Sequence, residues 1–462
     1  MLDISAEKIW KRPFVNAGKL LIGRGVQGVL SIAYLAFATR TLGAVDFGVL
    51  TLIHSSTLLL RHVLGFQSWQ MILRYGAKAL ETKNESHIVR LVGFACSIEF
   101  LAAMVGVFGL WVFAGEVVHQ LHIYDELAPM VRIYALMLIV LLISDVGLGI
   151  LRLTDRHDLI SWQVTIEPII RFFGAGYLFL NGGTLIEFIW VWFVAGMMSR
   201  IGLILIALWN LSTHVKTFRE EAQIGNLAIP PIESGKFKAP EKGLWKYVFG
   251  TNLDYGLSLG INQLGPVLIG IVLGAGPAGL YRVAQQFSNI IASPINKMLL
   301  PAIYTDMTWL NAKGGGGDRR NMVMRTGMIA GGVAVAIFFI LVVFGHYLID
   351  AIAGVEFHDA YGVMLVLVFA SAITALSFAL EPLLMTAGKV RQVITARLLS
   401  TLAYIVFMVW LADDEMFGLM GAGYALLGRA VVFMLIAWFY GRSLMGPEAL
   451  KDVAKITKAH KA

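Results

Sequence analysis

Long apolar segments separated by short polar ones recur along the whole chain. Each is about 20 residues or longer, the length that a helix needs to cross the roughly 30 Å hydrocarbon layer of a membrane. Backbone N–H and C=O groups find no water there, so we predict helices, in which these groups form hydrogen bonds with one another. Twelve spans follow from this pattern: 14–39, 47–72, 90–114, 128–151, 159–181, 184–211, 244–273, 277–305, 323–349, 360–386, 392–411 and 417–441.

Composition removes several other classes of protein. Of the 462 residues, 58% are hydrophobic and 15% are charged. Soluble domains are about 45–50% apolar and about 25% charged, so a soluble enzyme or a disordered chain is excluded. The single cysteine, Cys96, lies in an apolar segment, which rules out an intrachain disulfide. The chain is predicted to be an all-α, multi-pass membrane protein.

Basic residues distinguish the two sides of the predicted membrane. The loops of one side contain a single basic residue, Arg40, and several acidic ones. Lysine and arginine concentrate in cytoplasmic loops of inner-membrane proteins, so both termini are predicted to be cytoplasmic. The net charge of +7 is explained by this asymmetry and does not indicate nucleic acid. Basic residues on the predicted cytoplasmic side include Lys8, Arg74, Arg156, Lys238, Arg320, Arg391 and Lys455.

The spans divide into two sets of six. The longest polar stretch, 212–243, holds Pro230, Pro231 and Pro240 and separates them. A weak repeat supports the division, because LGAVDFGVL at 42–50 and LGAGPAGLY at 273–281 lie half the chain length apart, although such short turns also arise by chance. Six spans per half predict a parallel pseudo-two-fold repeat around a central cavity. The predicted parts are an N-terminal bundle (1–211), a cytoplasmic linker (212–243), a C-terminal bundle (244–441) and a basic cytoplasmic tail (442–462).

Charges within the spans need an explanation, because each costs about 2.5–3.5 kcal/mol at the membrane centre. Several of these charges have structural explanations. Arg132 and Glu187 lie near span ends and can extend to the interface. Glu167 and Arg171 are four residues apart and can pair on one helix face. Arg200 can pair with an acid of a neighbouring helix.

The remaining charges lie in polar stripes on the first, second, seventh and eighth spans. A stripe several turns long faces water, a partner helix or a substrate rather than lipid, so these stripes are predicted to border a cavity. Basic groups outnumber acidic ones within the spans, which favours an anionic cargo such as phosphate, diphosphate or uronate. The eighth span carries Arg282, Gln285, Gln286, Asn289, Ser293 and Asn296 at helical spacing, with Lys297 beside them.

Two segments carry a family resemblance. ATRTLGAVDFGVLTLIH at 38–54 is similar to the first hairpin of polysaccharide transporters, and LGAGPAGLYRVAQQFSNIIASPINKMLLPAIY at 273–304 resembles the corresponding part of their second half. These proteins are the O-antigen and exopolysaccharide flippase-like members of the multidrug/oligosaccharidyl-lipid/polysaccharide exporter superfamily. The resemblance implies two six-helix bundles around a V-shaped cavity. It also implies transfer of undecaprenyl-diphosphate-linked oligosaccharides from the cytoplasmic to the periplasmic leaflet by alternating access.

A lipid-linked oligosaccharide flippase of the inner membrane is therefore the leading interpretation, with polysaccharide polymerase and export proteins as candidate partners. An ion-coupled drug or metabolite antiporter of the same fold is the alternative. A membrane enzyme is disfavoured because the outer loops are too short for a catalytic domain. The site hypothesis assigns the diphosphate to Arg24, Arg61, Arg282 and Lys297, the glycan to Gln286, Asn289 and Asn262, and H⁺ or Na⁺ coupling to Asp254.

Other motifs are set aside. The glycine run Gly314–Gly317 has no following Lys-Ser or Lys-Thr, so it is not a phosphate loop. His119 and His122 are three residues apart but have no third ligand, and no metal site is assigned. No cofactor and no catalytic residue are predicted.

Overall fold

A computed structural model describes most of the chain, and its described part contains helices and no strand. The helices follow the apolar segments, because each segment can satisfy its backbone groups only internally. The described residues are 6–82, 84–224, 244–245, 261–294, 303, 307, 316–413 and 416–445.

The helices of the first half correspond to the first six predicted spans. The first two spans form one long element with a break at Gly43, and the fourth divides after Ala135. Their bounds are α1 (Ala6–Leu64), α2 (Ser68–Glu81), α3 (Glu85–Gln120), α4 (Ala128–Ala135), α5 (Met137–Leu153), α6 (His157–Asn181) and α7 (Leu185–Ile224).

The helices of the second half correspond to the last six spans. The tenth span divides near Phe378. Half of the seventh predicted span, residues 246–260, lies outside the described residues, and its last part is the shorter apolar helix α9. Their bounds are α9 (Ile261–Leu273), α10 (Ala275–Pro294), α12 (Gly316–Ile352), α13 (Ala360–Ser377), α14 (Leu380–Thr386), α15 (Val390–Leu411) and α16 (Leu419–Gly441).

Eight helices of the described part are long and apolar enough to cross a membrane. The predicted all-α, multi-pass fold is thereby confirmed. One boundary was wrong, because the second predicted span was to continue to residue 72. The helix ends at Leu64, and Gln67 has a left-handed φ of 54° before α2 begins at Ser68. The cause is a buried carboxylate on α3 that holds the turn, as described below.

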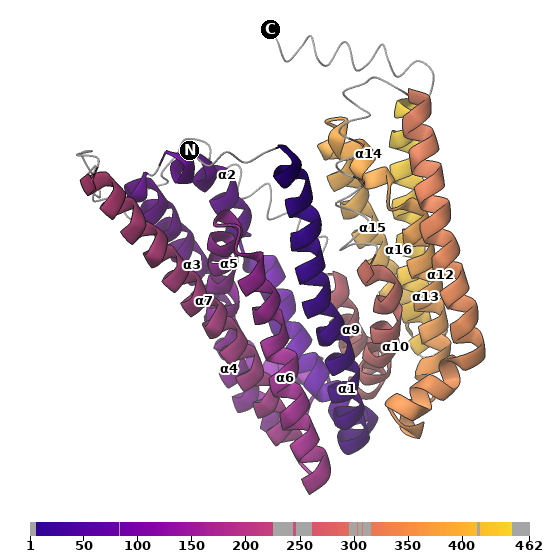
Figure 1. Cartoon of the computed structure of the whole chain (residues 1–462). Coiled ribbons are helices and arrows are strands. Elements are labelled where there is room, and N and C mark those ends of the chain that lie inside the picture. The colour runs from indigo at the N-terminus through magenta and orange to yellow at the C-terminus, as the bar shows by residue number, and fades with distance from the viewer. Residues whose placement is uncertain are drawn as a thin grey trace. The chain divides into compact units, whose positions relative to one another are not determined.

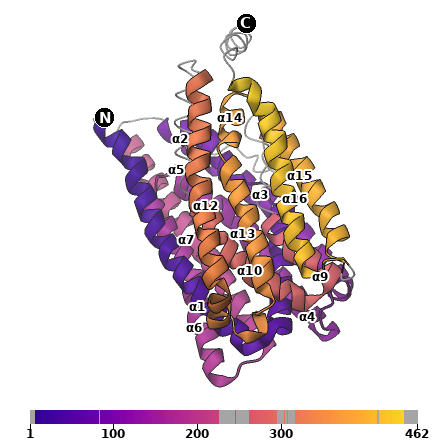
Figure 2. The ribbon, with the colours of Figure 1, turned by 90° about the vertical axis from the view of Figure 1, so that its right-hand side faces the viewer.

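The chain divides into two compact units with one exchanged segment. The first consists of Met1–Gly43 and Leu52–Leu264, and the second of Ala44–Thr51 and Gly265–Ala462. Within the first, α5 packs against α3 and α7 (Figure 1). Within the second, α13 packs against α12 and α16 (Figure 2). Residues 44–51 are thus close in sequence to the first unit but packed in the second.

The exchanged segment begins at a sharp corner that recurs in the second half. Gly43 has φ 70° and Gly274 has φ 89°, a region that favours glycine. After these corners the two repeats contact each other reciprocally. A Cβ on Gly48 would overlap the carbonyl oxygen of Ala275, and a Cβ on Gly279 would overlap that of Ala44. Small residues thus let two helix backbones touch, as is common between membrane helices.

Candidate functional site

An arginine assigned to substrate binding is held by a carboxylate within the first unit. Arg61 on α1 donates to Oδ1 of Asp145 on α5 over 2.7 Å. The arginine side chain is 16% exposed and that of Asp145 is 6% exposed. Sequence spacing placed Arg61 in a polar stripe but did not identify this partner on a distant helix. Asp145 offsets the charge of Arg61 and fixes the direction of its guanidinium group.

Glu167 on α6 joins two further arginines. Its Oε1 lies 2.6 Å from Nη2 of Arg171, four residues later, and its Oε2 lies 3.7 Å from Nη2 of Arg200 on α7. Both pairings expected from the sequence are confirmed. Two guanidinium groups share one carboxylate here, so this cluster retains an excess of positive charge.

The guanidinium of Arg171 is also enclosed by rings. It lies 5.0 Å from the ring centroid of Trp192 and 5.7 Å from that of Tyr34, within range of a cation–π contact. His54 approaches it at 3.5 Å and forms a 2.7 Å hydrogen bond with the hydroxyl of Tyr134. This arrangement immobilises Arg171, which favours a structural role for it.

Glu99 on α3 is fully buried and explains the helix break after Leu64. It accepts the hydroxyl of Ser68 at 2.6 Å and the backbone N–H groups of Ser68 and Phe66 at 3.3 Å each. These donors belong to the turn between α1 and α2. A carboxylate that satisfies three donors makes this turn more favourable than the predicted continuation of the helix.

The turn between α5 and α6 is charged and lies outside the spans. Arg156 donates to both carboxylate oxygens of Asp158 at 3.0 Å each. These hydrogen bonds hold the pKa of Asp158 below its usual value and raise the pKa of Arg156. Both side chains are more than a third exposed, which identifies the turn as a solvated cap.

The second unit carries the polar stripe of the eighth span on α10. Arg282 donates to the side-chain oxygen of Gln285 at 2.8 Å. Gln286 and Asn289 are half-buried on the same helix. Ser288 is buried and bonds to the hydroxyl of Ser371 on α13 at 2.7 Å, so this side of α10 packs against a helix. Gln285 is neutral, so this particular hydrogen bond does not offset the charge of Arg282.

Arg429 on α16 was not assigned a role from the sequence. It has no ion pair among the described residues, and its Nε is buried without a hydrogen-bond partner there. Tyr281 and Tyr404 are its electrostatic neighbours, together with Arg397, which itself pairs with Glu381 at 2.5 Å. The signal in the sequence was a lone arginine in the middle of an apolar span. Arg429 is therefore a cation that no carboxylate neutralises within the described unit.

The remaining predicted site residues divide into two groups. Asn262 is exposed in the first turn of α9. Lys297, Asp254 and the side chain of Arg24 lie outside the described residues. Arg282, Gln286 and Asn289 are thus brought onto one helix, whereas Arg61 belongs to the other unit.

The long apolar helices of the described part define a class of protein, the multi-pass membrane proteins. Solved structures of transport proteins share the fold. An inward-facing multidrug resistance transporter of the MATE family matches with a TM-score of 0.70 and 12% identity, over 92% of this chain and 96% of its own. The lipid II flippase MurJ in an inward closed conformation matches with a TM-score of 0.69 and 11% identity, over 92% of this chain and 87% of its own.

The family follows from the sequence match. The family model described as polysaccharide biosynthesis protein matches residues 15–304, more than half of the chain, and the chain belongs to this family. The inner membrane protein YghQ of Escherichia coli strain K12 is 26% identical in an alignment 361 residues long, which covers 73% of this chain and 91% of that protein. The resemblance to polysaccharide transporters is thereby confirmed.

Proposed function

We propose that this protein is a flippase that transfers a lipid-linked oligosaccharide, with undecaprenyl diphosphate as the lipid, from the cytoplasmic to the periplasmic leaflet. Transfer proceeds by alternating access between two six-helix bundles, 1–211 and 244–441, with both termini cytoplasmic. The product serves the synthesis of surface polysaccharides such as O-antigen or exopolysaccharide. Support comes from the polysaccharide biosynthesis family and from the fold shared with a lipid II flippase.

The observation that supports an anionic cargo is a buried cation in the second unit. Arg429 has no ion pair among the described residues, and its Nε is buried without a hydrogen-bond partner there. A charge inside the membrane costs free energy, so an intramembrane arginine usually marks a functional site. A diphosphate supplies the oxygens that guanidinium groups bind best.

The cargo is assigned to residues by its chemistry. The diphosphate is bound by Arg24, Arg61, Arg282 and Lys297, with Arg429 as an added candidate. The amides of Gln286, Asn289 and Asn262 bind glycan hydroxyls, and the prenyl tail stays in lipid. Because Asp145 already binds Arg61, that arginine contacts cargo only through donors that the carboxylate leaves available. Polymerase and export proteins are the partners of such a pathway.

Leaflet transfer of a prenyl-diphosphate oligosaccharide in proteoliposomes tests this function. We expect Arg282→Ala and Arg429→Gln each to lower the transfer rate by about tenfold or more, the loss of one charge-assisted hydrogen bond. Arg391→Ala is the matched control, because Arg391 is an exposed arginine in the first turn of α15 and should leave the rate unchanged. Unchanged transfer in both test variants, with folding intact, would contradict an anionic cargo read by these groups.

Asp254 is proposed to couple transfer to an H⁺ or Na⁺ gradient. In the same proteoliposomes, Asp254→Asn should remove the dependence of the transfer rate on an imposed H⁺ or Na⁺ gradient. The slower rate measured without a gradient should stay unchanged. The amide keeps the size of the side chain but cannot bind a proton or carry the negative charge that attracts Na⁺. A variant that keeps the full gradient dependence would refute this role.

The antiporter of the same fold remains the second candidate, since a multidrug transporter shares the fold. Its cationic cargo would favour an acidic interior. Efflux of a cationic dye from cells that express the protein separates the two candidates, and efflux without lipid transfer would replace the flippase proposal.

A further inference from the structure

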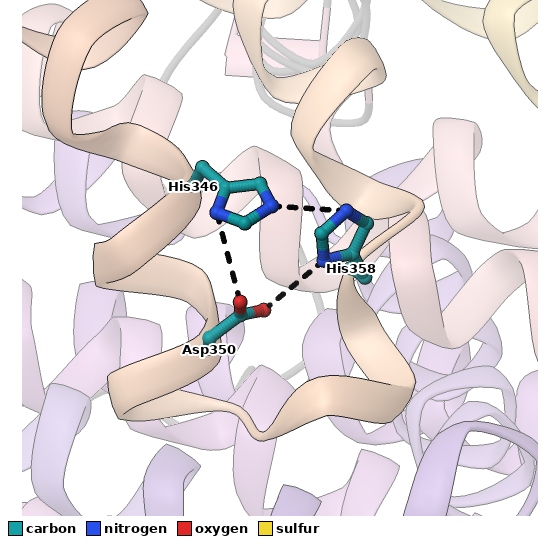
Figure 3. A group of neighbouring side chains, drawn as sticks. All are labelled: His346, Asp350 and His358. Carbon is teal, nitrogen blue, oxygen red and sulfur yellow. Dashed lines mark hydrogen bonds and ion pairs between the residues drawn. The ribbon is translucent and has the colours of Figure 1, made fainter.

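Three potential metal ligands meet where α12 ends and the chain turns into α13. His346 and Asp350 lie four residues apart near the end of α12, and His358 follows the short 3₁₀ helix η3 (Val355–Phe357). Nε2 of His346 lies 2.9 Å from Nε2 of His358. The two oxygens of Asp350 lie 3.7 Å from Nδ1 of His346 and 3.5 Å from Nδ1 of His358. Figure 3 shows the three side chains pointing toward one another.

We propose that His346, Asp350 and His358 bind a divalent transition-metal ion of the zinc type. One ligand atom from each residue lies within 4.8 Å of the others. Ligands of a tetrahedral zinc ion lie about 2.0–2.1 Å from the metal, and therefore about 3.3 Å from one another. The nitrogen–oxygen separations of 3.7 and 3.5 Å in the structure are close to this value. Two imidazoles and one carboxylate select zinc, nickel or copper over calcium and magnesium, and leave a fourth position for water.

The carboxylate has capacity for a metal. Oδ1 of Asp350 is covered by protein and accepts no hydrogen bond in the described part of the chain; its neighbour is Nδ1 of His358, 3.5 Å away. A cation bound between this oxygen and the imidazoles would satisfy it. The imidazoles are partly exposed, at 39% for His346 and 49% for His358, so an ion can reach the site from solvent.

The ion would fasten a loop that holds the exchanged segment. Between the ligands, Oε2 of Glu356 accepts the backbone N–H of Ala44 at 3.3 Å. The next residue, Phe357, is fully buried and packs its ring 5.9 Å from that of Phe47. A metal that joins α12 to His358 would therefore restrain the loop that contacts residues 44–47. All these residues belong to the second unit.

The sequence contains the three potential ligands, but their spacing along the chain does not show that they meet. His346 and Asp350 share one helix face at a spacing of four, which is compatible with metal binding. The third ligand comes eight residues later, after the left-handed Gly354 turns the chain back. Without that turn, His358 would lie far from the other two.

Metal titration of the full-length protein tests the site. Protein purified without a polyhistidine tag and stripped with chelator is titrated with Zn²⁺ by calorimetry and with Co²⁺ by visible absorption. We expect one saturable site per chain, with the absorption bands of tetrahedral Co²⁺. The double variant His346→Ala/His358→Ala should lose this site. The matched control His119→Ala/His122→Ala, which removes a histidine pair from another loop, should retain it.

Hydrogen exchange gives a second measurement, whose expected result a folding defect would not produce. Zn²⁺ should slow exchange of the amides at 44–48 in the wild-type protein and in the control. It should not do so in Asp350→Asn, which keeps the shape of the side chain and weakens its binding to a metal. Zinc binding that survives the histidine substitutions, or no saturable binding in the wild type, would overturn the proposal. Equal protection of 44–48 in Asp350→Asn would overturn the link to the loop.

Discussion

Gly48→Ala is expected to prevent stable folding of the second unit. The new methyl group would occupy the position of the Ala275 carbonyl oxygen, which is backbone and cannot rotate away. Overpacking costs about 1–3 kcal/mol where side chains can adjust, and more where they cannot. Such a loss is a large part of the 5–15 kcal/mol typical of folded proteins. The measurement is the membrane yield together with the thermal unfolding midpoint in detergent.

The reciprocal variant and a matched glycine make this prediction specific. Gly279→Ala should be equally damaging, because its methyl group would overlap the carbonyl oxygen of Ala44. Gly109→Ala is the control, since a Cβ there meets nothing within 4 Å on helix α3. Alanine stabilises a helix interior by about 0.5–1 kcal/mol over glycine, so this control should unfold at the same temperature or slightly higher. If Gly48→Ala and Gly279→Ala both unfold at the wild-type temperature, the two helices can move apart without a loss of stability, and the prediction is wrong.

Asp145→Ala is expected to destabilise the first unit by about 3–5 kcal/mol, the usual result of removing one partner of a buried ion pair. Arg61 would remain as a charge without its carboxylate in a membrane-embedded bundle. The double variant Arg61→Met/Asp145→Leu replaces both charges by apolar side chains of similar size. It should recover most of the lost stability, as measured by thermal unfolding.

This pair of variants separates a structural role of Arg61 from a role in cargo binding. The double variant is expected to fold but to transfer lipid-linked oligosaccharide at a tenth of the wild-type rate or less, since it lacks one proposed phosphate ligand. Wild-type transfer by the folded double variant would make Arg61 a partner of Asp145 alone. Arg200→Met is a matched control, because it also removes an arginine that contacts a carboxylate of the first unit but is not assigned to cargo.

The fold followed from the sequence wherever a local pattern decided the structure. Apolar length predicted the spans, and the spacing of four predicted the ion pair between Glu167 and Arg171. The break after Leu64 could not be predicted, because it depends on Glu99, which approaches from another helix. The corner at Gly43 was recognised as part of a repeat, but its contact with the second copy is tertiary.

The contacts of the candidate site residues could not be predicted from local sequence patterns. Arg61 and Arg171 are both arginines within apolar spans. The structure shows that Arg61 contacts Asp145 and that Arg171 lies among aromatic rings. Arg429 received no role from the sequence, because its lack of a carboxylate partner among the described residues is a property of the packed unit. The pairing of His358 with His346 depends on a turn that spacing alone does not reveal.

The crossing of Gly48 with Ala275, and of Gly279 with Ala44, has the form of a two-fold homodimer contact, in which residue i meets j and j meets i. Gene duplication and fusion of a six-helix ancestor that dimerised through this corner would produce such a chain. The two parts of the sequence are linked by packing, since residues 44–51 are encoded with the first half and packed in the second. A gene split in the 212–243 linker should therefore yield function only when both fragments are made in the same cell.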